Sequence, residues 1–173
     1  MYEKTYPSKR FRLTLFFLKK HIDTKASILD LGVNNPLSEL MRKEGFTVTN
    51  TDGEDLDEDR ETLLSSGADV TTAFEIIEHL LSPYEVLKTI KSDKLFLSIP
   101  LRLWFASAYK SKTDPRDKHY HEFEDWQLDW LLDKTGWQII DRMKFTNPTK
   151  KIGIRPLFRL FTPRYYLVYA KRK

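Results

Sequence analysis

Acidic and glycine residues stand where three short apolar runs of the sequence end. Asp30 and Gly32 close the run SILDLG. Asp52 and Gly53 follow FTVTNT, and Glu75 follows ADVTTAF. A carboxylate can accept two hydrogen bonds from a vicinal diol, and a glycine lets the backbone adopt conformations that bring it close to a ligand. These residues therefore predict a ligand-binding site where the three runs end.

Histidines supply a second kind of chemistry. His79 follows Glu75 and Glu78 in AFEIIEH, and His119 and His121 lie in HYHEF. The ordinary pKa of histidine, about 6.5, suits a general base, so His79 is a candidate catalytic residue. No metal site is expected, because two histidines two positions apart in a loop lack a third ligand and the chain has no cysteine.

The turn after Gly32 argues against a dinucleotide ligand. An NAD-type site needs further glycines so that the pyrophosphate can approach the backbone, but here Val33, Asn34 and Asn35 follow. Asparagine tolerates a positive φ better than most residues, so a tight bend is still expected. Asp30 has two interpretations, either a ligand contact or a hydrogen bond that orients the turn.

A regular alternation of strands and helices would place these residues together. Apolar runs predict strands over residues 27–32, 46–51, 68–74 and 94–99, and helical spacing predicts helices over 7–22, 36–45 and from 83 onward. Such a pattern is typical of a parallel sheet that is covered on both faces and opens at one carboxyl edge. Gly32, Asp52 and Glu75 would all lie at that edge.

The second half of the chain is less regular. It is predicted to hold a loop over 100–118, a helix over 123–134 and two strands over 137–145 and 164–171. Trp126, Trp130 and Leu131 share one face of that helix. Residues 147–163 contain three prolines and show no clear period.

Length and composition limit the organisation of the protein. The 173 residues, of which 40% are hydrophobic, suit one domain over 1–173, with an N-terminal helix (7–22), a core (26–145) and a C-terminal basic segment (146–173). No apolar run is long enough to cross a bilayer, and the first residues lack the apolar core of a secretory signal. We therefore expect a soluble, cytoplasmic protein with no transmembrane segment.

Charge is spread unevenly around a modest net value of +4. Residues 52–61 are dense in acids, whereas residues 142–173 hold ten lysines or arginines and no acid. The basic segment is interpreted either as a solvated surface or as a site for an anionic substrate, a membrane surface or nucleic acid.

Five segments in a fixed order carry a resemblance to a known family. They are ILDLG, a strand that ends at Asp52, TAFEIIEHLLSPYEVL, LFLSIP and HYHEFEDWQLDWLLDKTGW. From Ala26 to Ile140 the chain resembles class I S-adenosylmethionine-dependent methyltransferases, most of all the branch that acts on quinones, sugars and other metabolites. The resemblance implies an α/β Rossmann-like three-layer sandwich with a mostly parallel sheet and an antiparallel last strand near 165–170.

The resemblance also implies which residues meet S-adenosylmethionine, the expected cofactor. The cofactor-binding set is Asp30, Gly32, Val33, Asn34, Asp52, Gly53, Phe74 and Glu75. By the same resemblance, HYHEF precedes the helix that lies over the active site, so His119 or His121 would face the substrate. The candidate catalytic residues are His79 and His121, which would converge with the loop over 101–118 on the methyl group. That loop would supply an apolar wall of Trp104, Phe105 and Tyr109.

One part of the family's pattern is shortened in this chain. The interval from Asp52 to Asp69 is too brief for the helix and strand that the family normally places there. We therefore expect fewer than the family's usual seven strands, with one strand or helix shortened.

Two kinds of function remain open. The leading hypothesis is methyl transfer to a small-molecule or glycan/lipid-type acceptor that is anionic, with peripheral membrane contact in the lipid case. The alternative is a degenerate domain that binds a partner or nucleic acid without catalysis. Nucleic acid is not expected as a methyl acceptor, because Phe74, Glu75 and Ile76 stand where amide-nitrogen nucleic-acid methylases have a proline pair beside an aromatic residue. The sequence does not specify the oligomeric state.

Overall fold

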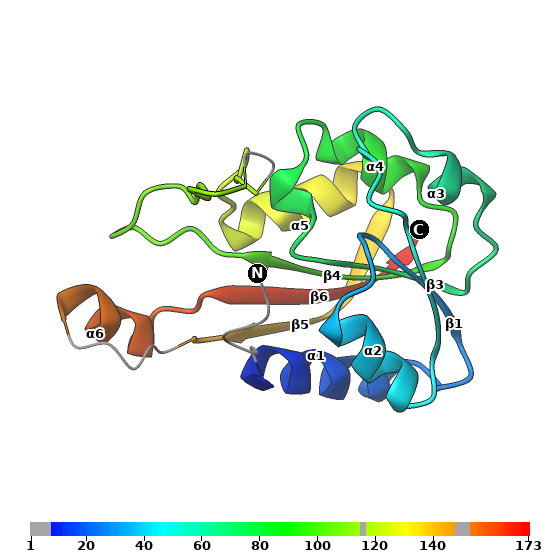
Figure 1. The fold of residues 1–173 in the computed structure, drawn as a ribbon, viewed down its shortest axis with the longest axis horizontal. Helices are drawn as coiled ribbons and strands as arrows, with labels where there is room; N and C mark the ends of the chain where they lie inside the picture. Colours follow the sequence, from blue (N-terminus) through cyan, green and yellow to red (C-terminus); the bar gives the residue numbers. More distant parts are fainter. Residues whose placement is uncertain (1–7, 115–116, 148–152) are drawn as a thin grey trace.

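The computed structural model describes residues 8–114, 117–147 and 153–173, and Figure 1 shows a twisted sheet between two layers of helices. The strands are β1 (Ser27–Asp30), β2 (Thr47–Asn50), β3 (Val70–Phe74), β4 (Lys94–Pro100), β5 (Trp137–Phe145) and β6 (Tyr165–Arg172). The α-helices are α1 (Ser8–His21), α2 (Pro36–Lys43), α3 (Glu61–Ser65), α4 (Pro83–Thr89), α5 (Asp125–Lys134) and α6 (Ile154–Phe161). A short 3-10 helix, η1 (Ile77–His79), follows β3.

The strands lie in the order β2-β1-β3-β4-β6-β5. β1 pairs in parallel with β2 and β3, and β3 pairs in parallel with β4. β6 runs antiparallel to both β4 and β5, so the predicted antiparallel last strand is confirmed. The described residues form six strands, and between β2 and β3 the chain makes only the five-residue helix α3. The predicted shortening is therefore also confirmed.

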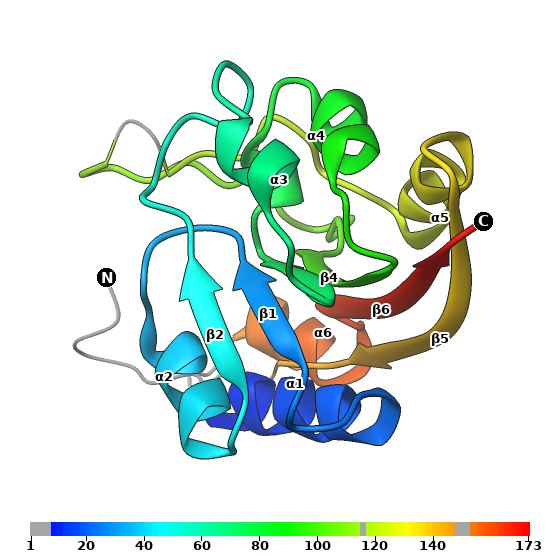
Figure 2. The same ribbon diagram turned by 90° about the vertical axis from the view of Figure 1, so that its right-hand side faces the viewer.

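Two apolar clusters, one on each face of the sheet, make up the core. α1 and α2 cover one face, where Phe17, Met41 and Phe96 are buried together (Figure 2). α3, α4 and α5 cover the other face, over a cluster that includes Leu87 and Leu128. Helices on both faces of a mostly parallel sheet make the Rossmann-like α/β sandwich that the sequence predicts.

The turn between β1 and α2 is shaped by a helix cap. The side-chain oxygen of Asn35 accepts hydrogen bonds from the backbone N–H groups of Leu37 and Ser38 at 2.9 and 3.2 Å. Pro36 occupies the first turn, where its missing N–H costs no hydrogen bond. Asn35 is extended, with φ −144, and Asn34 has no positive φ either. The bend therefore depends on an N-cap and not on a left-handed asparagine.

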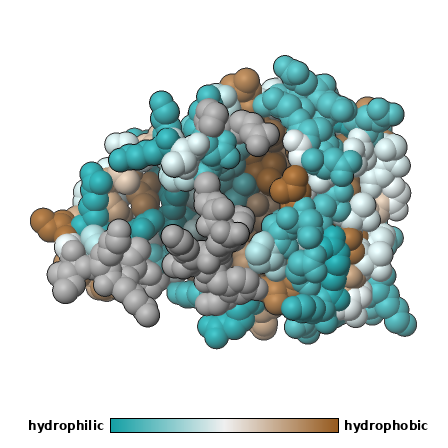
Figure 3. Space-filling model, in the orientation of Figure 1, coloured by the Kyte–Doolittle hydropathy of each residue, from teal (hydrophilic) through white to brown (hydrophobic). Residues whose placement is uncertain are grey.

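The segment 147–163, for which the sequence predicts no element, contains helix α6. Pro156 lies in the first turn of α6, where the N–H of a residue has no partner within the helix, so the proline ring does not break it. None of the residues of α6 is buried. Figure 3 shows apolar side chains, in brown, at this end of the molecule. The apolar residues Ile154, Leu157, Phe158 and Phe161 of α6 do recur at helical spacing, but this pattern is only eight residues long and lies in a segment with three prolines.

Helix α5 forms as predicted, but its tryptophans do not face the core. Leu128 and Leu132 are fully buried, whereas Trp126 and Trp130 are 58% and 61% exposed. Residue 7 and residues 148–152, which belong to the predicted N-terminal helix and basic segment, lie outside the described residues. Among the helices that are described, none has the length and hydropathy to cross a membrane.

Candidate functional site

A cavity of about 210 Å³ opens at the carboxyl ends of β1 and β3. Its lining is Arg10, Asp30, Leu31, Gly32, Val33, Asn35, Leu37, Phe74, Glu75 and Ile76. It therefore brings together Asp30, Gly32, Val33, Phe74 and Glu75 from the predicted cofactor-binding set. A larger cavity of about 420 Å³ lies between α1 and α2, and none of the predicted site residues lines it.

Asp30 is buried at the centre of a hydrogen-bond network. Its carboxylate accepts hydrogen bonds from Ser38 Oγ at 2.7 Å, Thr72 Oγ1 at 2.6 Å and Asn50 Nδ2 at 3.1 Å. Burial raises the pKa of Asp30, and these hydrogen bonds oppose the shift. Asn50 Nδ2 also donates to the backbone oxygen of Gly32 at 3.1 Å. The geometry thus favours the orienting role for Asp30 over a ligand contact.

Asn50 and Thr51, which are not among the predicted site residues, take part in the same turn. Thr51 Oγ1 accepts a hydrogen bond from the backbone N–H of Gly32 at 2.7 Å. The two residues close the apolar run FTVTNT, and polar side chains in that position are the signal that could have identified them. Side chains that follow β2 therefore hold the backbone that follows β1.

The turns after β1 and β2 touch through two residues of the predicted set. Gly32 and Gly53 both take a left-handed backbone, with φ of +100 and +85. A Cβ on Gly32 would lie 3.2 Å from Ile76 Cδ1, and a Cβ on Gly53 would lie 2.7 Å from Val33 Cγ1. Gly53 is therefore required both by its backbone conformation and by the approach of Val33.

Asp52 and Asn34 lie outside the lining of the 210 Å³ cavity. The side chain of Asn34 is engaged by α2, since it donates to Glu39 Oε1 at 2.8 Å and accepts from Arg42 Nη1 at 2.6 Å. The carboxylate of Asp52 is exposed and has no hydrogen-bond or ion-pair partner among the described residues. It is thus available to a ligand at the end of β2.

Glu75 has a strained backbone held by two side-chain contacts. Its φ of +59 is the only left-handed one among the described non-glycine residues. The carboxylate accepts a hydrogen bond from Ser98 Oγ at 2.8 Å and pairs with Arg10 Nη1 at 3.0 Å. The side chains of Arg10 and Glu75 are only 14% and 16% exposed. A strained residue in a cavity wall is a common mark of a functional site.

A second polar group lies just beyond Glu75, on η1. Glu78 is 1% exposed, yet neither of its carboxylate oxygens has a hydrogen-bond partner among the described residues. Burial, with the nearby carboxylate of Glu75, raises the pKa of Glu78 well above its ordinary value. His79 Nε2 lies 3.8 Å from Glu78 Oε1, and the ring of His79 lies 5.0 Å from that of His119.

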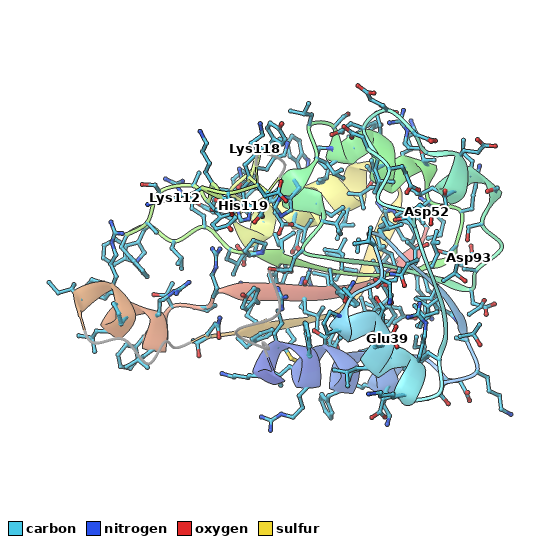
Figure 4. All side chains as sticks on the ribbon, in the orientation of Figure 1. Glu39, Asp52, Asp93, Lys112, Lys118 and His119 are labelled. Carbon is cyan, nitrogen blue, oxygen red and sulfur yellow. The ribbon has the colours of Figure 1, made fainter. Side chains whose placement is uncertain are left out.

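The loop over 101–118 returns to this group, but His121 does not face it. His79 Nδ1 lies 2.9 Å from the carbonyl oxygen of Lys118. The backbone N–H of His121 donates to the carbonyl of Glu78, whereas its ring nitrogen lies 3.4 Å from the carbonyl of Leu81. Figure 4 shows His119 beside Lys118 and far along the molecule from Asp52. The histidine that meets His79 is thus His119.

The aromatic residues of the loop divide between two partners. Trp104 and Phe105 pack on Phe158 of α6, with ring centroids 5.0 and 5.4 Å apart. Tyr109 lies 5.1 Å from the ring of His119. The expected apolar wall is therefore split, because two of its members join the loop to α6 and the third lies beside a histidine.

Comparison with known proteins identifies the family. A model of a methyltransferase domain matches residues 2–142. The chain belongs to this methyltransferase domain family. No curated protein matches it in sequence.

Solved structures share the fold of this methyltransferase. It is similar to a methyltransferase dependent on S-adenosylmethionine from Archaeoglobus fulgidus, with a TM-score of 0.69 and 16% identity over 98% of this chain and 96% of that chain. The 1,6-didemethyltoxoflavin-N1-methyltransferase of Burkholderia thailandensis was solved with 1,6-didemethyltoxoflavin and S-adenosylhomocysteine. Its TM-score is 0.66, with 15% sequence identity over 94% of this chain and 78% of that chain. A methyltransferase dependent on S-adenosylmethionine from Mesorhizobium loti has a TM-score of 0.65 and 14% sequence identity, over 99% of this chain and 100% of that chain.

The family match and the shared fold confirm the recognition of a class I methyltransferase, with S-adenosylmethionine as the cofactor of the family. The cavity at the carboxyl edge, the glycine turn and the exposed carboxylate of Asp52 suit a cofactor that carries a ribose diol and no phosphate. The residues present therefore fit the cofactor.

Proposed function

We propose that this methyltransferase binds S-adenosylmethionine over the turn after β1 and transfers a methyl group to a small-molecule or glycan/lipid-type acceptor. One observation carries the proposal, the cavity between Gly32 and Glu75 with the exposed Asp52 carboxylate beyond it. A carboxylate at the end of β2 can accept hydrogen bonds from both ribose hydroxyls. Asp30 has a structural role in this site, because its hydrogen bonds with Ser38 and Asn50 hold the turn after β1 in place.

The remaining members of the cofactor-binding set have proposed roles that follow from their positions. Gly32 lets the cofactor approach the backbone, and Val33 and Asn34 offer backbone groups at the turn. Gly53 lies against Val33, and Phe74 lies in the cavity wall. Arg10 and Glu75 place opposite charges in the lining, and this arrangement complements the zwitterionic amino-acid end of the cofactor.

When bound, the cofactor supplies an electrophilic methyl group. The task of the chain is to hold the acceptor in line with that group, and such positioning lowers the barrier without a strong base. We keep His79 and His121 as the proposed acceptor-side residues. His79 is near the cavity because it follows Glu75 on the same strand end.

The surface around the loop and α6 supports an anionic acceptor. Arg102, Lys110, Lys112, Arg155 and Arg159 belong to these two segments. Side chains of one sign raise the local concentration of an oppositely charged substrate. α6 also exposes Ile154 and Phe161, at 74% and 77%, and a helix with exposed apolar and basic residues suits a membrane surface. This combination supports the glycan/lipid-type acceptor.

Calorimetry with S-adenosylmethionine and S-adenosylhomocysteine tests the proposal. We expect the unmodified protein to bind both, and Asp52→Ala to weaken binding by about 1 to 3 kcal/mol, because a charged acceptor is removed from a fitted site. Glu58→Ala is the matched control, since Glu58 is an exposed acid of the same segment. Equal affinity of Asp52→Ala and the unmodified protein would place the ribose elsewhere. Undetectable binding by the unmodified protein would support the non-catalytic alternative.

A further inference from the structure

Glu78 is a buried carboxylate that the methyl-transfer site does not explain. Its side chain is 1% exposed, and both of its oxygens lack a hydrogen-bond partner within the described part of the chain. A carboxylate removed from water without hydrogen bonds is unfavourable unless a cation compensates it. The nearest nitrogen that a pairing could use is His79 Nε2, at 3.8 Å from Glu78 Oε1.

Two histidines face this carboxylate with their other ring nitrogens anchored. His79 Nδ1 lies 2.9 Å from the carbonyl oxygen of Lys118, and His119 Nδ1 lies 2.8 Å from Glu122 Oε1. A carbonyl oxygen can only accept, so His79 must carry its proton on Nδ1. Glu122 Oε1 also accepts from the N–H of Tyr109 at 2.9 Å, and this favours the same tautomer for His119. Nε2 of each ring then carries the lone pair.

We propose that Glu78, His79 and His119 form a binding site for one divalent transition-metal cation. One ligand atom from each residue lies within 4.8 Å of the other two. Metal bonds of about 2.1 Å in a tetrahedral shell need ligand atoms about 3.4 Å apart, so side-chain rotations bring the three into place. Metal-ligating histidines normally donate the other ring N–H to a carbonyl or a carboxylate, as His79 and His119 do here.

The donor set selects the kind of cation. Two imidazoles and one carboxylate suit Zn²⁺ and its first-row neighbours, whereas Mg²⁺ and Ca²⁺ prefer oxygen ligands. Three protein ligands also leave a coordination position for water or a substrate oxygen. Binding of the cation does not depend on the proposed methyl transfer. Use of the open position by an acceptor oxygen does rest on it.

The site departs from the sequence-based expectation of no metal. That expectation considered only the segment of His119 and His121, which holds no convincing third ligand. The structure takes two ligands from η1 and one from the end of the loop, while the ring of His121 lies by the carbonyl of Leu81. The cation would also tie the loop to η1, which gives His79 a ligand role in place of that of a general base.

Titration of the chelator-treated full chain with Zn²⁺ and Mn²⁺ tests the site. We expect one equivalent to bind in calorimetry and to raise the melting temperature. Glu78→Gln and His119→Ala should each weaken binding at least about tenfold. His121→Ala is the matched control and should bind as the unmodified chain does.

The outcomes separate this site from the cofactor site. No saturable binding by the unmodified chain overturns the proposal, and so does an equal loss of affinity in His121→Ala and His119→Ala. If a variant fails to fold, Glu122→Gln replaces it, since Glu122 is not itself a proposed ligand and holds His119 Nδ1, so its loss should weaken binding without removing a ligand. S-adenosylmethionine affinity, measured on the same samples, reports separately on the proposed function.

Discussion

Asp30 and Glu78 are both buried carboxylic acids at the same edge of the sheet, yet they differ in how they are paired. Asp30 is 2% exposed and accepts three hydrogen bonds from side chains. Glu78 is 1% exposed and accepts none from the described residues. The comparison teaches that burial alone does not distinguish a structural acid from one that can receive a ligand. The number of internal partners does.

The two acids also belong to regions of different character. Around Asp30, the turn after β1 is closed by contacts from Asn50 and Thr51. Around Glu78, the backbone of Glu75 is left-handed and the loop over 101–118 contributes its contacts from a distance in the sequence. The buried acid of the first region has its hydrogen bonds satisfied by neighbouring side chains, whereas the buried acid of the second has no such partner among the described residues.

Loss of the satisfied acid should have the largest effect on stability. Asp30→Ala removes the acceptor for Ser38, Thr72 and Asn50, and should lower the free energy of unfolding by about 3 kcal/mol, because buried donors are left without partners. Urea denaturation followed by circular dichroism measures this change. Asp30→Asn, which keeps one acceptor oxygen, is the control and should cost less. A loss below about 1 kcal/mol for Asp30→Ala would show that the hydrogen bonds of Asp30 do not stabilise the turn as proposed.

Removal of the unsatisfied charge should act in the opposite direction. In the metal-free protein, Glu78→Gln should raise the free energy of unfolding by about 1 kcal/mol at neutral pH, because a buried carboxyl group whose ionisation is unfavourable is replaced by a neutral amide. Glu75→Gln is the matched control on the same strand end and should destabilise, since it loses the pair with Arg10. Differential scanning calorimetry of both variants decides. If both lose stability alike, Glu78 has internal partners in solution.

The smallest expected effect concerns Asp141, which contacts α1, the helix that carries Arg10. Hydrogen bonds from Lys20 at 2.7 Å and His21 at 2.8 Å, with the Arg142 N–H, lower the pKa of Asp141 from 3.8 to about 2. The folded state thus favours the charged form, so the stabilisation is complete above pH ~4 and is lost as the pH falls through about 2.

Asp141→Asn should therefore be less stable than the unmodified protein at pH 7 and equal to it at pH 2. The difference should stay below about 1 kcal/mol, because the pair with Lys20 is partly exposed and screened by water. Thermal denaturation across this pH range measures it, and added salt should reduce it further. A difference that persists unchanged at pH 2 would show that packing, not charge, holds α1.

The meeting of Gly32 and Glu75 in one cavity could be predicted because its signals are local. Gly32, Asp52 and Glu75 each follow an apolar run, and parallel strands bring such ends to one edge. The acceptor region could not be predicted as well, since Glu78 and His119 belong to segments far apart in the chain. Their approach depends on the path of an irregular loop, which no periodic pattern records. α6 was missed for a different reason, because its apolar residues recur at helical spacing over only eight residues, in a segment that holds three prolines.

The contact between the turns after β1 and β2 has a consequence for related sequences. Val33 comes so close to Gly53 that a Cβ there would lie 2.7 Å from Val33 Cγ1. The two positions therefore share a fixed volume, and one can enlarge only if the other stays small. In an alignment of homologues we expect positions 33 and 53 to covary, with branched residues at 33 confined to chains that keep glycine at 53. A homologue with a side chain at position 53 should therefore have a residue smaller than valine at position 33.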